Sequence, residues 1–547
     1  MPEDSIPRFP ALQSTKHEDY FFHETEPDVF ERKTLGFETM FILLSKGDLR
    51  FGSNLVMTAQ VYVVSSADIQ SLLREVWIQL RYKVPHIACT THAFDAGEFG
   101  FKYTVPALPG HVEKWLATTL TFNERRQRHL DCLNSLTSTL VSFVSTGRYN
   151  AELFACPCVE GGYLLSLKAG HHAIDRIGAT LLYIQLLDIL AALVKGEALP
   201  LPEWGQEVQR LPPALIAVVA GSEDALVETA RKAALLPPFE EPRDDMKWIP
   251  KHRVSTGSVS SLITVSREGT TALRRVSKEE LVTVTDVLTS LAVLAQTNVA
   301  LEDARRRGYF NETASWYLQA QNYIIPAVPA ARIAMLPKKY HQSFDNGMPL
   351  LTVESTIVSS PMASIQRAVF PDSASTRVVR SDARSAISHV IQDVHQALKS
   401  IDYSRDATLA HHARSCDRIP FTVDFFKGCT PALVALSSLG DVQRFFKQYM
   451  TPLSSENERG VWVKRALLCA NNQTATLLVT ASQLNGSESV ICNCGGGDEG
   501  AETMRRFVTL FIQYLNCFIG QDGAAVLSAF SVTNPQGDNH TNLKNLK

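Results

Sequence analysis

The stretch LSLKAGHHAIDRIGATLLYIQLLDIL (residues 165–190) decides how the first part of the chain folds. It follows AELFACPCV and the pair Gly161-Gly162, a pattern typical of a β-hairpin whose second strand leads into two adjacent histidines. The apolar run that starts at Ile177 predicts a buried helix, and Gly196 suits the left-handed position after its last residue. The sequence therefore predicts a strand, a short polar turn and a long helix, with the histidines in the turn.

The turn carries residues that could do proton chemistry. His171 and Asp175 lie four residues apart. A neutral imidazole can remove a proton from a hydroxyl or amine that attacks an acyl carbon, because its pKa lies near the working pH of most enzymes. Asp175 could support such a histidine by pairing with a cation elsewhere in the chain and fixing the turn. The pattern His-x-x-x-Asp is common by itself, so its meaning depends on the surrounding sequence.

The length of the chain, 547 residues, exceeds one ordinary hydrophobic core and predicts two domains with a cleft between them. Prolines are dense between Pro200 and Pro250, which is typical of a long crossover. We expect an N-terminal domain over residues 1–198, a Pro-rich linker over residues 199–252 and a C-terminal domain over residues 253–547. Each half mixes strand-like and helix-like patterns, so the predicted class is α/β, with a sandwich in each domain.

Long helices are predicted in both halves. Residues 111–136 and 277–308 each show a helical pattern, and Ser277 and Glu280 have capping-box spacing at the start of the second. The segment GAETMRRFVTLFIQYLNCFIG (residues 500–520) predicts a closing helix.

Composition argues against several classes of partner. With a net charge of -3 and scattered Lys and Arg residues, the chain offers no basic surface for nucleic acid. Its amino terminus lacks a signal-peptide pattern, so we expect a cytoplasmic protein whose cysteines are thiols. Cys492 and Cys494 lie close together, but no second Cys or His pair follows them at zinc-site spacing, so no metal site is expected. The apolar run of residues 177–194 contains Gln185 and Asp188, which favours a buried helix over a membrane span.

Around the histidines, the sequence resembles the CoA-dependent acyltransferase superfamily: plant BAHD acyltransferases, fungal trichothecene acetyltransferases and the condensation domains of peptide synthetases. The motif of that family, His-x-x-x-Asp-Gly-x-Gly between a strand and a long helix, stands here as HHAIDRIGA (residues 171–179). Residues 61–85 are similar to the family's first strand and helix, residues 282–296 to the helix after its crossover, and residues 500–515 to its last helix. The resemblance implies two tandem chloramphenicol-acetyltransferase-like α/β sandwich domains with an active-site channel between them.

The resemblance also implies roles for residues of the motif. His171 matches the family's general base, and Gly178 matches its later glycine. If His172 were the base instead, Arg176 would stand where the aspartate belongs. With His171 as the base, Arg176 replaces the glycine that usually follows the aspartate, so an arginine side chain is expected to enter the channel or to shift the backbone.

Further site residues come from the second half. The family pairs its motif aspartate with an arginine there, and Arg332 matches it, which implies a supporting salt bridge between Asp175 and Arg332. The stretch SSLGD (residues 437–441) is similar to a Ser-rich turn in condensation domains and fungal acetyltransferases. The residues expected to line the channel are His172, Arg176, Ser437 and Ser438.

The implied activity is transfer of an acetyl or other short acyl group from acyl-CoA to a hydroxyl of a small secondary metabolite. Acetyl-CoA would serve as co-substrate, without a permanently bound cofactor or metal, and the enzyme is expected to be a monomer. One alternative is a standalone condensation-like enzyme that takes its acyl group from a carrier-protein thioester. Because Arg176 departs from the family motif, another is a scaffold that now carries out a non-acyl reaction such as cyclisation.

Overall fold

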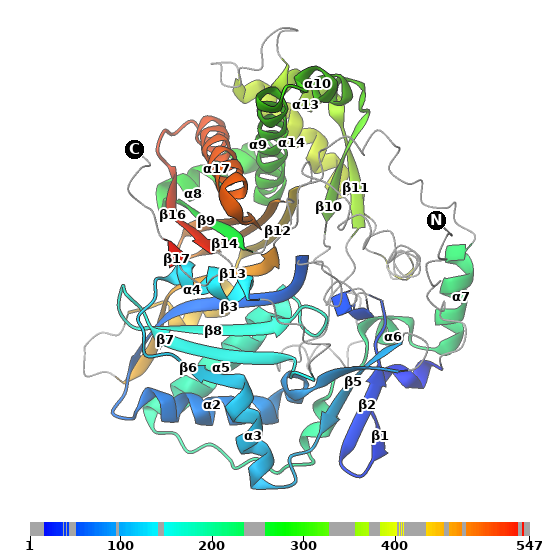
Figure 1. The fold of residues 1–547 in the computed structure, drawn as a ribbon, viewed down its shortest axis with the longest axis vertical. Helices are drawn as coiled ribbons and strands as arrows, with labels where there is room; N and C mark the ends of the chain where they lie inside the picture. The colour runs from blue at the N-terminus through cyan, green and yellow to red at the C-terminus, as the bar shows by residue number, and fades with distance from the viewer. Residues whose placement is uncertain are drawn as a thin grey trace.

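The structure of the chain is a computed structural model. It describes residues 16–36, 38–39, 41–42, 51–94, 98–139, 147–234, 257–327, 356–370, 383–401, 404, 406, 409, 434–452, 459–472, 477–533 and 539–540. Within these residues, two large sheets stack one above the other, each with helices on its outer side (Figure 1).

The first sheet has five strands and carries the histidine motif. In spatial order its strands are β13 (Gly460–Asn472), β3 (Phe51–Val64), β8 (Tyr163–Gly170), β7 (Ala151–Pro157) and β6 (Leu120–Phe122). The predicted hairpin is present as β7 and β8, and Gly161 and Gly162 in its turn have φ values of 92° and 71°, which suit glycine. β13 pairs antiparallel with β3, so a strand from late in the chain completes the sheet of the N-terminal half.

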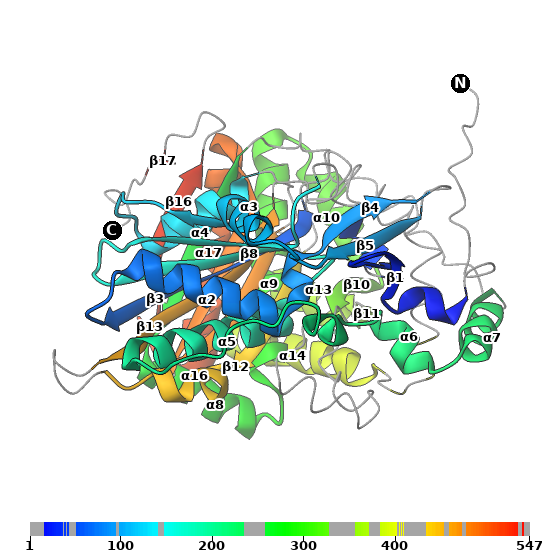
Figure 2. The ribbon, with the colours of Figure 1, turned by 90° about the horizontal axis from the view of Figure 1, so that it is seen from below.

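Helices α2 (Ile69–Lys83) and α5 (Arg176–Lys195) pack together on one face of the first sheet, and they lie in front of it in Figure 2. The residues of β8 that point into this core are Leu165, Leu167 and Ala169. As predicted, α5 ends at Gly196 in the left-handed conformation. By length and composition α5 could cross a membrane, but its apolar side chains lie in the core between the sheet and α2.

The second sheet has six strands. They are β12 (Val434–Asp441), β14 (Leu477–Leu484), β15 (Ser487–Gly495), β9 (Ser258–Val265), β16 (Ala525–Thr533) and β17 (Asn539–His540). The helices on its outer side are α9 (Val284–Arg307), α14 (Ala383–Lys399) and α17 (Gly497–Ile519). By length and composition α9 could also cross a membrane, and it too is packed in a core.

Helix α4 (His129–Ser138) joins the inner faces of the two sheets. It contacts β3 and β13 of the first sheet and β9 and β16 of the second. An apolar cluster fills this interface, formed by Val56, Leu130, Leu133, Leu262, Leu467, Cys469 and Ile491. Next to the cluster, the buried Asn134 side chain accepts hydrogen bonds from the hydroxyls of Ser258 and Ser260 at 2.9 and 2.8 Å. Apolar and polar contacts therefore both fix the sheets against each other.

A smaller sheet lies beside the first one, near the histidine turn. Its strands are β1 (His23–Glu26), β2 (Val29–Lys33), β5 (Phe99–Thr104) and β4 (Thr90–Ala93). The remaining elements named by the structure include the pair β10 (Asn322–Ala327) and β11 (Thr356–Pro361), with helices α3 (Pro109–Thr119), α6 (Leu215–Ala220), α7 (Glu223–Ala234), α8 (Arg267–Glu279), α10 (Phe310–Gln319), α13 (Met362–Val369) and α16 (Gln443–Phe446).

Two helix predictions were wrong in their extent. The segment 111–136 is divided into α3 and α4, because residues 120–122 between them pair with β7 as a parallel strand. In the segment 277–308 the hydroxyl of Ser277 donates to a carbonyl inside α8, so Ser277 is no cap. The chain turns at Leu281, which has a positive φ, and α9 begins at Val284 with Thr283 as its N-cap.

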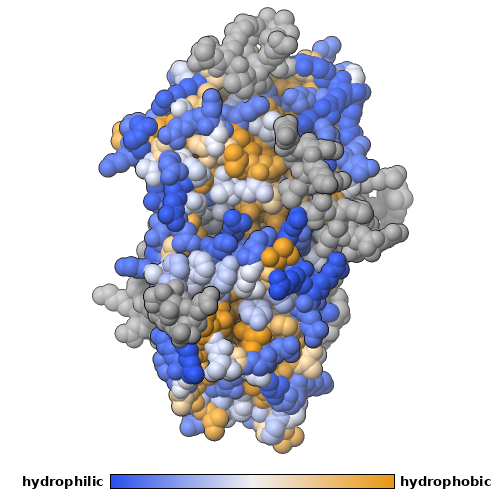
Figure 3. All heavy atoms as spheres, turned by 90° about the vertical axis from the view of Figure 1, so that its left-hand side faces the viewer, coloured by the Kyte–Doolittle hydropathy of each residue, from blue (hydrophilic) through white to orange (hydrophobic). Residues whose placement is uncertain are grey.

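The outer surface carries no single dominant apolar face on the side seen in Figure 3. Hydrophilic residues cover most of that side, and apolar residues gather in smaller patches between them.

Candidate active site

The histidine turn is held by backbone and side-chain hydrogen bonds between β8 and α5. The carbonyl of Gly170 accepts from the backbone N–H groups of Ala173 and Ile174 at 3.0 and 3.1 Å. Asp175 is the N-cap of α5, and its carboxylate accepts from the backbone N–H of Gly178 at 2.7 Å. The structure therefore brings the two motif residues Asp175 and Gly178 together and gives the aspartate a capping role that sequence reasoning did not assign.

The second histidine of the pair is part of the core. His172 is fully buried, its ring stacks on that of Phe101, and its Nε2 lies 2.9 Å from the hydroxyl of Thr91. Burial, with a smaller contribution from His171, lowers the pKa of His172 to about 3. A Cβ on Gly170 would come within 2.3 Å of this ring, so glycine is needed there. His172 was expected to line the channel and lies instead in the protein interior.

His171 occupies the outer position of the turn and is partly exposed. Its imidazole stacks face to face on Phe41, with ring centroids 4.0 Å apart and an interplanar angle of 11°. Sequence reasoning missed Phe41, because it lies more than a hundred residues away in a segment with no clear periodicity. Of the two adjacent histidines, His171 is thus the one with solvent access.

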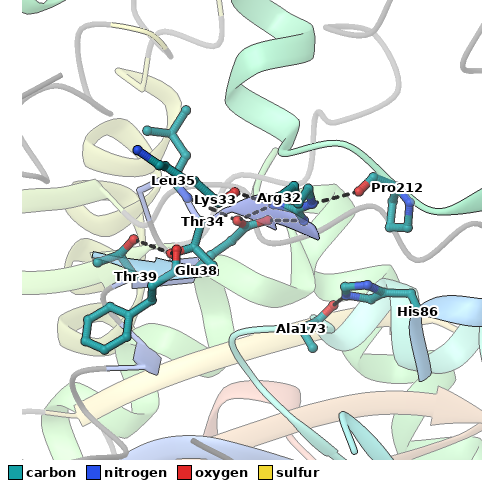
Figure 4. A network of polar contacts seen from close by, with 10 residues as sticks. Arg32, Lys33, Thr34, Leu35, Glu38, Thr39, His86, Ala173 and Pro212 are labelled. Atoms are coloured by element: carbon teal, nitrogen blue, oxygen red, sulfur yellow. Dashed lines mark hydrogen bonds and ion pairs between the residues drawn. The ribbon is translucent and has the colours of Figure 1, made fainter. Parts of the chain in front are cut away.

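A buried ion pair lies close to the turn (Figure 4). The guanidinium of Arg32 donates to both carboxylate oxygens of Glu38 at 2.9 Å, and its Nε donates to the carbonyl of Pro212 at 2.9 Å. Both partners are almost fully buried. His86 lies beside this network and its Nε2 is 3.2 Å from the carbonyl of Ala173 in the histidine turn.

Arg176 connects the histidine turn to the second sheet. Its guanidinium donates to the backbone carbonyl of Ser437 in β12 and to the hydroxyl of Thr480 in β14, each at 2.7 Å. The side chain is buried, and desolvation lowers its pKa to about 10. No carboxylate among the described residues forms an ion pair with it. Arg176 is the first residue of α5, and its side chain contacts the second sheet. Its expected place along the channel stays a prediction.

The other residues that the sequence singled out lie in different parts of the chain. Ser437 and Ser438 lie half-buried on β12, and Ser437 pairs with Thr480 of the parallel neighbour β14. Arg332 lies outside the described residues, so the salt bridge with Asp175 stays a prediction. Cys492 and Cys494 belong to the core strand β15, and within the described part of the chain no three His, Cys, Asp or Glu side chains gather where a metal could bind.

Comparisons with known proteins agree on the architecture. No protein-family model and no curated protein matches the sequence. Among solved structures, the TRI3 trichothecene 15-O-acetyltransferase from Fusarium sporotrichioides aligns with a TM-score of 0.67 at 12% identity, over 91% of this chain and 98% of that chain. The chain has the trichothecene acetyltransferase fold.

Further structures share this fold at lower similarity. F. graminearum TRI101, solved with coenzyme A and T-2 mycotoxin, aligns with a TM-score of 0.50 at 12% identity, over 86% of this chain and 97% of that chain. The first condensation domain of the calcium-dependent antibiotic synthetase gives a TM-score of 0.51 at 14% identity, over 88% of this chain and 96% of that chain. The predicted fold class, two tandem chloramphenicol-acetyltransferase-like α/β domains, is confirmed.

Proposed function

We propose that this chain is an acyl-CoA-dependent O-acyltransferase that transfers an acetyl or other short acyl group to a hydroxyl of a small molecule. His171 is the proposed general base. The observation that supports this best is the combination of the trichothecene acetyltransferase fold over almost the whole chain with the placement of His171. In that placement the ring of His171 is partly exposed directly after β8, whereas its neighbour His172 is buried.

The proposed reaction needs one proton acceptor. The neutral imidazole of His171 takes the hydroxyl proton of the acceptor while the hydroxyl oxygen attacks the thioester carbonyl of the acyl-CoA. When the tetrahedral intermediate collapses, the carbon–sulfur bond breaks and the CoA sulfur receives the proton from the imidazolium. The products are an ester and free CoA, and the histidine returns to its neutral form. Asp175 holds the turn by capping α5 and does not need to touch the substrate.

We also propose that the enzyme acts as a monomer in the cytoplasm, where its thiols stay reduced. The eight described cysteines are all free, and burial raises the pKa of Cys469 to about 11, which keeps that thiol protonated at neutral pH.

A carrier-bound donor is the second candidate, because a condensation domain shares the fold over 88% of this chain. Such an enzyme would take the acyl group from the phosphopantetheine arm of a carrier protein. The two donors share the same thioester chemistry, so the choice depends on which thioester the protein accepts.

The test is an acyl-transfer assay with both donors. Wild-type protein is incubated with acetyl-CoA or with an acetylated carrier protein, together with a panel of small alcohols that includes a trichothecene alcohol. Thiol release is followed by a colorimetric reagent, and the ester is identified by mass spectrometry. We expect ester formation from acetyl-CoA. Ester formed from the carrier alone would support the second candidate, and no ester from either donor would contradict an acyltransferase.

A further inference from the structure

We infer that Phe41 is a positioning residue for His171, and that the buried pair Arg32–Glu38 holds Phe41 in place. The inference rests on the proposed function for its catalytic consequence. Its structural part rests only on contacts among residues of the small sheet, the histidine turn and the short helical segment that carries Phe41.

The contact between Phe41 and His171 restricts the imidazole. The two rings are 4.0 Å apart and almost parallel, at 11°. Phe41 therefore covers one face of the imidazole and opposes rotation of the ring, while the two nitrogens at the ring edge remain in the plane where hydrogen bonds form. A base whose nitrogen must meet a bound hydroxyl within hydrogen-bond distance gains from such a fixed orientation.

The segment of Phe41 is anchored on both sides of that residue. Three residues before it, Glu38 accepts two hydrogen bonds from Arg32 and a third from the backbone N–H of Leu35 at 3.1 Å. One residue after it, Ile42 is buried against Phe99 of β5. A glutamate in this position would be costly to bury without its arginine, so the pair fixes where the segment can lie.

Arg32 reaches toward both histidines of the motif. Through Glu38 it holds the segment that stacks on His171. Its guanidinium also lies over the ring of Phe101, 4.8 Å from the centroid, and Phe101 stacks on His172. One buried arginine thus contacts both segments that support the histidine turn.

Phe41 also affects the charged form of the base. When His171 accepts a proton, the imidazolium lies against the negative face of an aromatic ring, an arrangement that favours a cation. This stabilisation is present only after proton transfer has begun, so its loss should lower kcat more than it changes KM.

The test compares Phe41→Leu and Phe41→Ala with Phe41→Tyr, which keeps the aromatic face. The control is Phe122→Leu, the same change at a half-buried phenylalanine of β6, whose described ring contact is with Tyr163. We expect Phe41→Leu to lower kcat about tenfold with little change in KM, since loss of a cation–π contact at a half-buried site is of this order. Phe41→Tyr and the control should stay close to wild type.

A second readout does not need acyl transfer. Diethyl pyrocarbonate modifies imidazole nitrogens, and peptide mass spectrometry gives the rate for His171 separately. We expect faster modification of His171 in Phe41→Ala and in Glu38→Gln than in wild type. If the wild type transfers no acyl group but His171 is still modified faster in the two variants than in the wild type, the inference holds and the proposed function fails. Equal modification rates in all variants would overturn the inference, as would an unchanged kcat of Phe41→Leu in an active enzyme.

Discussion

The guanidinium of Arg176 donates a 2.7 Å hydrogen bond to the backbone carbonyl of Ser437, and so links the first residue of α5 to the second sheet. A second bond of equal length reaches the hydroxyl of Thr480 on the adjacent strand. Arg176 follows Asp175 directly, in the position where the related motif carries glycine. The arginine that replaces the motif glycine therefore connects the two halves by hydrogen bonds. It does so one residue after Asp175, the N-cap of α5.

Replacing Arg176 by alanine should destabilise the fold. The change leaves the Ser437 carbonyl and the Thr480 hydroxyl without their donor, which costs about 2–3 kcal/mol of unfolding free energy. Urea unfolding measures this loss, with Arg275→Ala as the control. Among the described residues, that exposed arginine forms an ion pair with Glu279 on the same helix, so its loss should matter by less than about 0.5 kcal/mol.

Arg176→Ala also tests whether these two hydrogen bonds affect activity. If Arg176 steadies the histidine turn, kcat for acyl transfer should fall in Arg176→Ala. A higher rate with a larger acceptor would show instead that the arginine narrows access to the site.

Stability should decline in mild acid because of buried neutral histidines. Burial lowers the pKa of His172 to about 3 and that of His129 to about 4, and it lowers that of His86 as well. In the unfolded chain each histidine titrates near its ordinary value of about 6.5, so below this pH the unfolded state binds protons that the folded state does not. The unfolding free energy therefore falls as the pH falls from about 6.5 toward 4.

A variant isolates the contribution of one of these histidines. His172→Gln removes the titrating ring, and an amide can still meet the hydroxyl of Thr91. Between pH 6 and 4.5, each such histidine contributes a slope of about 1.4 kcal/mol per pH unit, so the slope in the variant should be smaller by about that amount. Urea midpoints across this range give the slopes, and equal slopes in both proteins would contradict a neutral, buried His172.

Removing one partner of the Arg32–Glu38 pair should lower the unfolding free energy more than replacing both partners together. Glu38→Gln leaves a buried guanidinium without its counter-charge and should lower the unfolding free energy by about 3–5 kcal/mol. The double variant Arg32→Met with Glu38→Leu removes both charges and should recover part of that loss. Calorimetry of Arg32→Met, Glu38→Leu and the double variant checks this, and a double variant as unstable as the sum of these two single changes would speak against the pairing.

Two substitutions of Asp175 separate its capping role from the predicted salt bridge. Asparagine can still cap α5 by accepting from Gly178 but carries no charge, whereas alanine also loses the cap, at about 1 kcal/mol more. If Arg332 pairs with Asp175, Arg332→Ala should destabilise the wild type and have no further effect in the Asp175→Asn background. Additive effects in this double-mutant cycle would exclude the pair.

Local sequence patterns predicted the elements around the site well. The hairpin of β7 and β8, the apolar helix α5 and its end at Gly196 all follow from patterns within a few residues of each other. Glycines with positive φ and a continuous apolar run act locally, so a single sequence contains them in readable form.

Contacts between distant segments could not be predicted in this way. The pairing of β13 with β3, the stack of Phe41 on His171 and the bonds from Arg176 to β12 and β14 join residues far apart in the chain. The packing of the sheets determines which residues meet in these contacts. No periodicity in the sequence around any of these residues indicates its partner. The resemblance to acyltransferases pointed to Arg176 as unusual, but only the structure places its guanidinium.

Parallel measurement of kcat/KM for acetyl transfer in His171→Ala and His172→Gln decides which histidine acts, and whether either does. His389→Ala serves as the control, because that histidine is exposed on α14, on the outer side of the second sheet. If His171 is the general base, His171→Ala loses about 100-fold or more, while His172→Gln keeps most of the activity of the folded protein. Unchanged turnover in His171→Ala would contradict the proposed mechanism.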